Sequence, residues 1–358
     1  MSNRGWLLDS IGDISLKDLP MPKLKAGEVL VKVKAVGICG SDIPRVYKTG
    51  AHIMPIVPGH EFSGIVDGVS EGVDPSWIGK RVAVFPKIAC GKCDQCKKGN
   101  PGSCRNYDYI GSRRDGAFAR YVSAPASNLL EIPDSVSFEE GAMFEPLGVA
   151  ANAVRSGLQN ASSGKDLTFA VCGLGTIGFM VALILRSQGY RNVFLIGNKD
   201  TQRMRAVGLG FDESNYIDAG AGDALKILKE KTYGGIDIYF ECVGKNECIS
   251  MGIESVAPGG RVVLVGNPYS DMYFPKDTYW KILRDQITIK GIWNAYFKQG
   301  HSIYEAVDDW HFILRKIVEG SLKPAKLISH TFSLEQTEKG LLIMRDKTED
   351  YCKVIIVM

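Results

Sequence analysis

Apolar and polar side chains alternate with a period of two through much of the first 150 residues, a pattern typical of half-buried β-strands. Glycine and proline residues separate the alternating runs, as they do at turns between strands. The clearest runs read EVLVKVKAV, RVAVF and FARYV, and they predict strands over residues 29–36, 81–85 and 118–122. The pattern therefore predicts a β-rich N-terminal domain.

The pattern changes near residue 155, where short apolar runs begin to alternate with segments of helical period. The runs predict strands over residues 167–171, 193–196, 236–240 and 261–265, and an apolar helix over residues 177–186 follows the first of them. Strands that alternate with helices of this length indicate βαβ units and a doubly wound parallel sheet.

Beyond residue 295 the mixed pattern returns. It predicts a helix over residues 303–319, a strand over 327–332, a helix over 334–344 and a closing strand over 353–357. We therefore expect an α/β protein in which the parallel-sheet unit is inserted into a discontinuous β-rich domain. The boundaries that we assign are 1–155 and 296–358 for the β-rich domain and 156–295 for the inserted domain.

Composition restricts the class of protein. The 358 residues are 45% hydrophobic, enough for two cores, and the net charge of only +3 disfavours a nucleic-acid or anionic-membrane surface. The N-terminal residues lack the layout of a signal peptide, and no apolar run reaches membrane-spanning length. Nine cysteines without a secretion signal indicate a reducing compartment. We expect a cytoplasmic protein that binds neither membrane nor nucleic acid.

Four cysteines lie within one polar loop in the spacing C-x2-C-x2-C-x7-C, namely Cys90, Cys93, Cys96 and Cys104. Four thiolates can surround Zn2+ with no vacant position, as in a closed structural site. A disulfide cluster is one alternative, but nothing else in the sequence indicates secretion. An iron–sulfur cluster is another, but the spacing differs from the bacterial iron–sulfur motif. The motif therefore predicts structural zinc.

A glycine-rich turn follows the first strand of the inserted unit and opens its apolar helix. Gly173, Gly175 and Gly178 form a G-x-G-x-x-G motif, with Thr176 and Ile177 between the second and third glycines. In dinucleotide-binding folds the first glycine permits a tight turn, the second lets the pyrophosphate approach the backbone, and the third lets helix and strand pack closely. A purely structural turn is the alternative, but the strand–turn–helix setting favours a nucleotide site.

Residues at the end of the second strand of this unit should contact the adenosine ribose of the cofactor. NAD enzymes place an acidic residue there, about twenty residues after the glycines. This chain has Gly197, Asn198 and Lys199 instead, with Arg203 nearby. A 2′-phosphate would not be repelled, so the sequence favours NADP, unless Asp200 takes the acidic role or the cations are ordinary surface charges.

A second group of metal-ligating residues is spread over the first 150 positions. Cys39 follows a predicted strand, His60 and Glu61 lie in the motif GHEFSG, and Glu145 lies in FEPL. A thiolate, an imidazole and a carboxylate can hold zinc and leave the fourth position to water or substrate, as in a catalytic site. Taken singly, each residue could equally be a core or ion-pair residue, but here they accompany a cysteine motif and a nucleotide loop.

In this order, the motifs GICGSD, GHEFSG, the four cysteines, EPL and GLGTIG resemble the zinc-containing medium-chain dehydrogenases over essentially the whole chain. The EPL segment is similar to that of the polyol (sorbitol-type) branch, which has a glutamate near the metal. Residues 41–52 and 107–121 resemble the galactitol-phosphate dehydrogenases within that branch.

The resemblance implies a GroES-like catalytic domain with both zinc sites, a Rossmann domain that binds NAD or NADP, and a cleft between them. It implies Cys39, His60 and Glu145 as ligands of the catalytic zinc, with Glu61 as a direct ligand or its neighbour. It also implies that the cofactor is held by the residues already named at the glycine loop and by Val243, Val265 and Gly266. The reaction would be oxidation of a secondary alcohol, with the zinc lowering the pKa of the hydroxyl.

Two departures from the family matter. Ser70 stands where the family has a small Gly or Ala, a change that we expect to be tolerated. Many relatives carry a histidine shortly after GSD, whereas this chain has Ile, Pro and Arg at 43–45. The proton path cannot be copied in full, which leaves Ser41 as the candidate relay and His52 as a second option.

The same resemblance makes an alditol or alditol phosphate the expected substrate, and family members are homodimers or homotetramers. A phosphate requires fixed cations, and the candidates are Arg45, Lys48, Arg113 and Arg114. Each could instead be a solvated charge or an ion-pair partner. A non-catalytic zinc protein would lose the open metal site, and a DNA-binding zinc ribbon needs a basic face with aromatic residues. Neither description fits this sequence.

Overall fold

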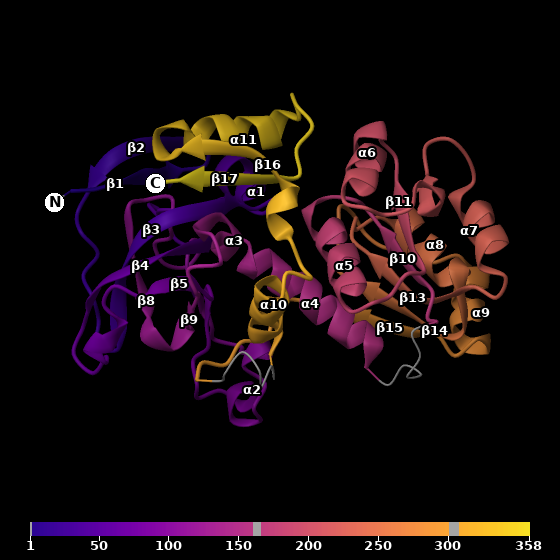
Figure 1. Cartoon of the computed structure of the whole chain (residues 1–358), viewed down its shortest axis with the longest axis horizontal. Helices are drawn as coiled ribbons and strands as arrows, with labels where there is room; N and C mark the ends of the chain where they lie inside the picture. The colour runs from indigo at the N-terminus through magenta and orange to yellow at the C-terminus, as the bar shows by residue number, and fades with distance from the viewer. Residues whose placement is uncertain (1, 160–165, 301–307) are drawn as a thin grey trace. The chain divides into compact units, whose positions relative to one another are not determined.

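The computed structural model describes residues 2–159, 166–300 and 308–358, and the chain forms two compact units (Figure 1). The first comprises Met1–Gly148 and Tyr296–Met358, and the second comprises Val149–Ala295. The chain thus leaves the first unit once and returns to it. Among the described helices, none is both long and apolar enough to cross a bilayer.

The first unit is built on a seven-stranded sheet in the order β16-β17-β3-β4-β5-β9, with β8 paired to β3. All its neighbouring strands are antiparallel except β16 and β17. The strands are β3 (Glu28–Ile38), β4 (Glu61–Val69), β5 (Arg81–Val84), β8 (Tyr121–Pro125), β9 (Leu129–Glu131), β16 (Ile328–Ser333) and β17 (Lys353–Val357).

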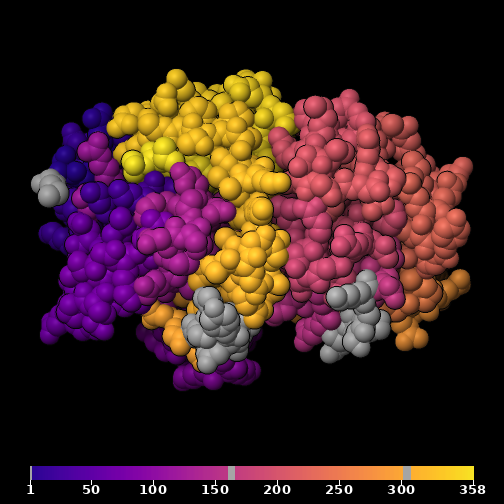
Figure 2. Space-filling model, in the orientation of Figure 1, coloured from indigo at the N-terminus to yellow at the C-terminus, as the bar shows by residue number. Residues whose placement is uncertain are grey.

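Smaller elements complete this unit. Two two-stranded sheets pair β1 with β2 and β6 with β7. Their bounds, with those of the helices, are β1 (Asn3–Ser10), β2 (Asp13–Leu19), β6 (Lys87–Ile88), β7 (Asp108–Tyr109), α1 (Asp42–Pro44), α2 (Asp94–Lys97), α3 (Phe138–Ala142), α10 (Asp309–Val318) and α11 (Thr337–Asp346). The C-terminal segment, yellow in Figure 2, lies against the N-terminal part of this unit, because β17 pairs with β3.

The alternating pattern of the first predicted strand is confirmed in β3. Val29, Val31 and Val33 are buried, whereas Lys32 between them is exposed. From residue 35 onward every side of β3 is covered, because β17 and β4 pair with that end. The strand predicted over residues 118–122 is wrong at its start, since β8 begins three residues later. Residues 118 and 119 are apolar because they pack against β1 and bridge to it.

The second unit contains a six-stranded parallel sheet in the order β12-β11-β10-β13-β14-β15, which confirms the predicted doubly wound fold. The strands are β10 (Phe169–Cys172), β11 (Val193–Gly197), β12 (Tyr216–Asp218), β13 (Ile236–Glu241), β14 (Val256–Leu264) and β15 (Thr288–Gly291). The helices are α5 (Thr176–Ser187), α6 (Asp200–Gly208), α7 (Ala224–Thr232), α8 (Asn246–Ser255) and α9 (Lys276–Arg284).

Strand order reverses between β10 and β13, so the crevice at their carboxyl ends is where such sheets bind ligands. Two further helices bear on the predictions. Helix α4 (Phe144–Leu158) was not predicted, and Glu145 lies in its first turn. Residues 303–307 of the predicted helix 303–319 lie outside the described residues, and α10 begins at Asp309 after a cap by Asp308.

Candidate metal and nucleotide sites

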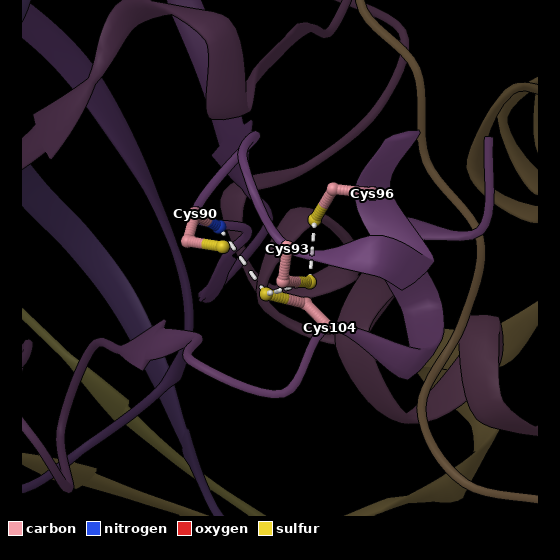
Figure 3. Close-up of side chains that lie close together, drawn as sticks. All are labelled: Cys90, Cys93, Cys96 and Cys104. Carbon is pink, nitrogen blue, oxygen red and sulfur yellow. Dashed lines mark hydrogen bonds between the residues drawn. The ribbon is translucent and has the colours of Figure 1, made fainter. Parts of the chain in front are cut away.

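The four cysteines of the polar loop converge, as the spacing predicts (Figure 3). Their sulfur atoms all lie within 4.8 Å of one another. The Sγ atom of Cys93 is 3.5 Å from that of Cys96 and 3.8 Å from that of Cys104, and the backbone N–H of Cys90 donates to the Cys104 sulfur at 3.3 Å. Sulfur atoms at this spacing fit around one tetrahedral zinc ion.

The loop also prepares one thiol for deprotonation. The backbone N–H groups of Cys96 and Arg105 point at the Cys93 sulfur and lower its pKa to about 6. Burial raises the pKa of Cys96 to about 12. A metal ion would replace these thiol protons, because it binds the thiolate form.

A second group consists of Cys39, His60 and Glu61, whose ligand atoms also lie within 4.8 Å of one another. Cys39 directly follows β3, His60 directly precedes β4, and Glu61 is the first residue of β4. The antiparallel register of β3 and β4 pairs Gly37 with Glu61. The two motifs are therefore brought together by strand pairing.

Asp42 orients this group. One of its carboxylate oxygens accepts the backbone N–H of Cys39 at 3.0 Å, and the other lies 3.5 Å from Nδ1 of His60. Burial alone raises the pKa of Asp42, but the charges of His60 and Arg45 and the Cys39 N–H bring it down to about 2. The imidazole therefore turns Nδ1 toward a carboxylate and leaves Nε2 for a metal, the usual support of a zinc-bound histidine.

His60 is buried, and burial by itself lowers the pKa of its imidazole. The carboxylate of Asp42 and the sulfur of Cys39 outweigh that effect and raise the pKa well above the ordinary value. The site therefore favours a positive charge on this edge of the imidazole, and a metal cation would take the place of the proton.

A buried lysine pairs with the third member of the group. Nζ of Lys353, in β17, contacts one carboxylate oxygen of Glu61 and donates to the carbonyl oxygen of Ile38 at 3.2 Å. Gly37 is required beneath this pair, because a Cβ there would meet the Glu61 carboxylate and would lie 2.7 Å from Cε of Lys353. The other oxygen of Glu61 remains for a metal.

Glu145 lies beside this group but is not a member of it. Its carboxylate accepts a hydrogen bond of 3.1 Å from the hydroxyl of Tyr109, whose ring centroid is 5.7 Å from that of His60. Burial raises the pKa of Glu145, and the charge of Glu61 adds to that effect, while His60 opposes it. Ser41 is also close, with its hydroxyl donating to the Cys39 sulfur at 3.3 Å.

The donor set fits zinc. A thiol, an imidazole and a carboxylate converge, and they are the three ligand types that zinc accepts in catalytic sites. One buried cation accompanies these ligands, namely Lys353. Burial lowers the pKa of its amine, but the charge of Glu61 outweighs that effect and raises it.

The glycine loop lies where the sequence placed it, between β10 and α5. Gly173 has φ +93°, and a Cβ on it would lie 2.5 Å from Cγ2 of Val243. A Cβ on Gly178 would run into the carbonyl oxygen of Gly173. Gly175, the N-cap of α5, faces open space instead, with nothing within 4 Å of a Cβ. Thr176 then begins the helix, so the backbone at Gly175 is free to meet a pyrophosphate.

Val243, Val265 and Gly266 lie at the carboxyl ends of β13 and β14, next to this loop. The buried carboxylate of Glu241 accepts the N–H groups of Val243 and Gly244, at 2.8 and 2.7 Å. Its backbone oxygen accepts those of Val265 and Gly266. Glu241 thus ties two strand ends together at the switch point of the sheet.

The end of β11 presents Asn198 and Lys199 to solvent. Gly197 is enclosed, since a Cβ would lie 2.6 Å from Oε1 of Gln202. Arg203 forms ion pairs with Asp200 at 3.0 Å and with Glu213 at 2.5 Å, so its charge is already engaged. Lys199 is the cation that remains for a 2′-phosphate.

Two family models match the chain. Residues 25–134 match the alcohol dehydrogenase GroES-like domain, and residues 176–310 match the zinc-binding dehydrogenase model. The chain therefore belongs to the zinc-binding alcohol dehydrogenases, which confirms the resemblance seen in its motifs. It is an NAD(P)-dependent oxidoreductase that acts on CH–OH groups.

Among individual relatives, the galactitol 1-phosphate 5-dehydrogenase of Escherichia coli K12 is 32% identical over 91% of this chain and 92% of its own. A crystal structure of the E. coli galactitol-1-phosphate dehydrogenase matches with a TM-score of 0.88, at 29% identity over 99% of this chain and 100% of the other. Sorbitol dehydrogenase of Bacillus subtilis is 31% identical over 92% and 90% of the two chains. A zinc-binding dehydrogenase of Sinorhizobium meliloti, crystallised with NADP, has a TM-score of 0.87, at 27% identity over both whole chains.

Sequence reasoning missed three residues around the metal group. Asp42 and Tyr109 lay inside quoted motifs, so their polar side chains offered a signal. No sequence signal marked Lys353, because it lies 292 residues from Glu61 in sequence. The pairing of β17 with β3 brings the two residues together.

Proposed function

We propose that this chain oxidises a secondary alcohol of an alditol phosphate, similar to galactitol 1-phosphate, to the corresponding keto-sugar phosphate, and transfers the hydride to NAD or NADP. The observation that carries the proposal is the convergence of Cys39, His60 and Glu61 in a dehydrogenase of this family. The similarity to the galactitol 1-phosphate enzyme over nearly the whole chain supports the choice of substrate.

Cys39, His60 and Glu61 hold the catalytic zinc in this proposal, and Glu145 borders the position left for substrate. Zinc, when bound, supplies a Lewis acid that lowers the pKa of the substrate hydroxyl. Ser41 takes the proton at Oγ and passes it to water, since its hydroxyl already lies 3.3 Å from the Cys39 sulfur. Cys90, Cys93, Cys96 and Cys104 hold a second, structural zinc.

The β-rich domain, which the sequence assigns to residues 1–155 and 296–358, acts as the catalytic domain, and residues 156–295 bind the dinucleotide. Gly173, Gly175 and Gly178 receive the pyrophosphate at the start of α5, and Lys199 favours NADP. Val243, Val265 and Gly266 would hold the nicotinamide, which would supply the hydride acceptor. The protein supplies position and electrostatics, while the cofactor supplies the redox chemistry.

We also propose a cytoplasmic homodimer or homotetramer. The oligomer is supported by the outer edge of β15, which pairs with no further strand among the described residues, and by exposed apolar side chains of the second unit. Trp280 and Leu283 on α9 and Trp293 just after β15 are 45%, 52% and 68% exposed. A sheet edge and exposed apolar side chains are typical of surfaces that associate with a second subunit.

The test is a substrate panel. The purified enzyme is assayed with galactitol 1-phosphate, sorbitol 6-phosphate, galactitol and sorbitol, each with NAD and with NADP. We expect kcat/KM to be at least tenfold higher for the phosphates than for the free alditols. Equal use of both would contradict the proposal and favour a dehydrogenase of unphosphorylated polyols such as sorbitol.

A further inference from the structure

The four cationic side chains that the sequence suggests for a substrate phosphate have different partners in the structure. Arg114 is engaged, because its guanidinium lies 2.7 Å from the buried carboxylate of Glu28. Arg45 pairs with Asp42, which supports the metal group. Lys48 lies exposed on a π-helical turn. Among the described residues, Arg113 has no carboxylate partner.

Arg113 is nevertheless held in place. Its guanidinium carbon lies 4.6 Å from the centroid of the Tyr107 ring, a cation–π stack that limits the motion of the group. Its Nε is buried and has no hydrogen-bond partner in the described part of the chain. A buried donor without an acceptor costs free energy, so the position suits a ligand that supplies an acceptor oxygen.

His52 lies beside Arg113. Its backbone N–H donates to the carbonyl oxygen of Ser112 at 3.2 Å, which ties the two segments together. Partial burial lowers the pKa of the imidazole, and the positive charges of Arg113 and Arg45 lower it further. The two guanidinium groups therefore lie close enough to the imidazole to affect its charge, and together they make this region positive.

This region is connected to the metal group by a short run of aromatic contacts. The Tyr107 ring that supports Arg113 lies 6.3 Å from the Tyr109 ring, and the Tyr109 ring lies 5.7 Å from His60. The segment from Tyr107 to Arg113 therefore links the metal group to the positive region.

We propose that Arg113 and His52 form an anion subsite that binds the phosphate of the substrate, an inference that rests on the proposed function. The guanidinium offers a planar fork that matches two phosphate oxygens, and the imidazole adds a single N–H donor. Tyr107 holds the fork, and Arg114 lies outside the subsite because it is bound to Glu28.

The experiment measures a specificity ratio, namely kcat/KM for galactitol 1-phosphate divided by kcat/KM for galactitol. Arg113→Gln should lower this ratio at least tenfold, because a charge-assisted hydrogen bond is lost only with the phosphate ester. His52→Asn should lower it about threefold or more. Lys48→Gln removes the same charge from a nearby exposed position and should change the ratio less than twofold. Thermal unfolding of each variant confirms that the protein is folded.

Inorganic phosphate separates the subsite from the proposed function. It should inhibit galactitol oxidation competitively in the wild type, and its inhibition constant should rise at least tenfold in Arg113→Gln. If galactitol and its phosphate are used equally while this inhibition persists, the subsite stands and the proposed function fails. If the phosphate is preferred but Arg113→Gln and His52→Asn keep the wild-type ratio, the subsite is wrong. An equal loss of the specificity ratio in Lys48→Gln would also overturn the subsite, because the overall positive potential of the surface would then explain the preference for phosphate.

Discussion

In the zinc-free protein, replacing Lys353 by methionine should destabilise the first unit strongly, because the substitution leaves the carboxylate of Glu61 buried without a cation. Both side chains are almost inaccessible, at 2% and 1% exposure. Two unit charges in contact at about 3 Å attract each other by about 5 kcal/mol at an effective dielectric constant of 20. Methionine keeps most of the lysine stem, so packing changes little. We expect a loss of about 3–5 kcal/mol, the usual result of breaking a buried pair.

The assay is urea unfolding followed by tryptophan fluorescence, to which Trp6 contributes from the first unit, where it is buried and donates to the carbonyl oxygen of Leu334. Glu61→Leu alone should lower the free energy of unfolding by a similar amount, because it leaves the ammonium group of Lys353 buried without an anion. The double variant Lys353→Met with Glu61→Leu should recover most of the loss, because neither charge then remains.

A surface pair provides the matched control. Lys80 and Glu131 lie 2.7 Å apart, but their side chains are 34% and 55% exposed. Lys80→Met should therefore cost no more than about 1 kcal/mol. The reasoning is refuted if Lys353→Met costs as little as Lys80→Met, or if the double variant is less stable than both single variants.

Three further predictions concern the other sites. Gly178→Ala should lower the free energy of unfolding by about 1–3 kcal/mol, because its Cβ would meet backbone atoms. Gly175→Ala should keep wild-type stability but weaken NADH or NADPH binding at least tenfold in fluorescence titrations, and equal effects of the two variants on stability would contradict the assignment. Asn198→Asp should shift the kcat/KM ratio toward NAD at least tenfold, about 1.4 kcal/mol, and an unchanged ratio would show that this position does not face the ribose. Elemental analysis should find about two zinc ions per chain, with Cys93→Ser losing one together with stability and Cys39→Ser losing the other together with activity.

Local patterns identified the four strands of the second unit that carry short apolar runs, β10, β11, β13 and β14, but not the edge strands β12 and β15. The glycine spacing identified the nucleotide loop, although the close neighbour of Gly173 is Val243, far along the chain. The same holds for the four cysteines, because all of them lie within one loop whose first and last cysteines are 14 positions apart. In such cases the physical cause lies within one turn or one βα unit, so the sequence reports it directly.

The arrangement of the second metal-ligating group was decided by tertiary structure. The motifs supplied Cys39, His60 and Glu61 as candidates, but their convergence depends on the register of β3 against β4. The engagement of Arg114 also depends on a distant carboxylate, that of Glu28.

The sequence by itself determined the fold class, the family and the candidate ligands, because apolar period, glycine spacing and cysteine spacing act over short distances. Only the folded chain decided which charges are neutralised. An ion pair such as Lys353 with Glu61 forms between strands far apart in sequence, and its strength comes from burial that the whole unit creates. Coulomb interactions depend on distance in space, so no local pattern along the chain records them.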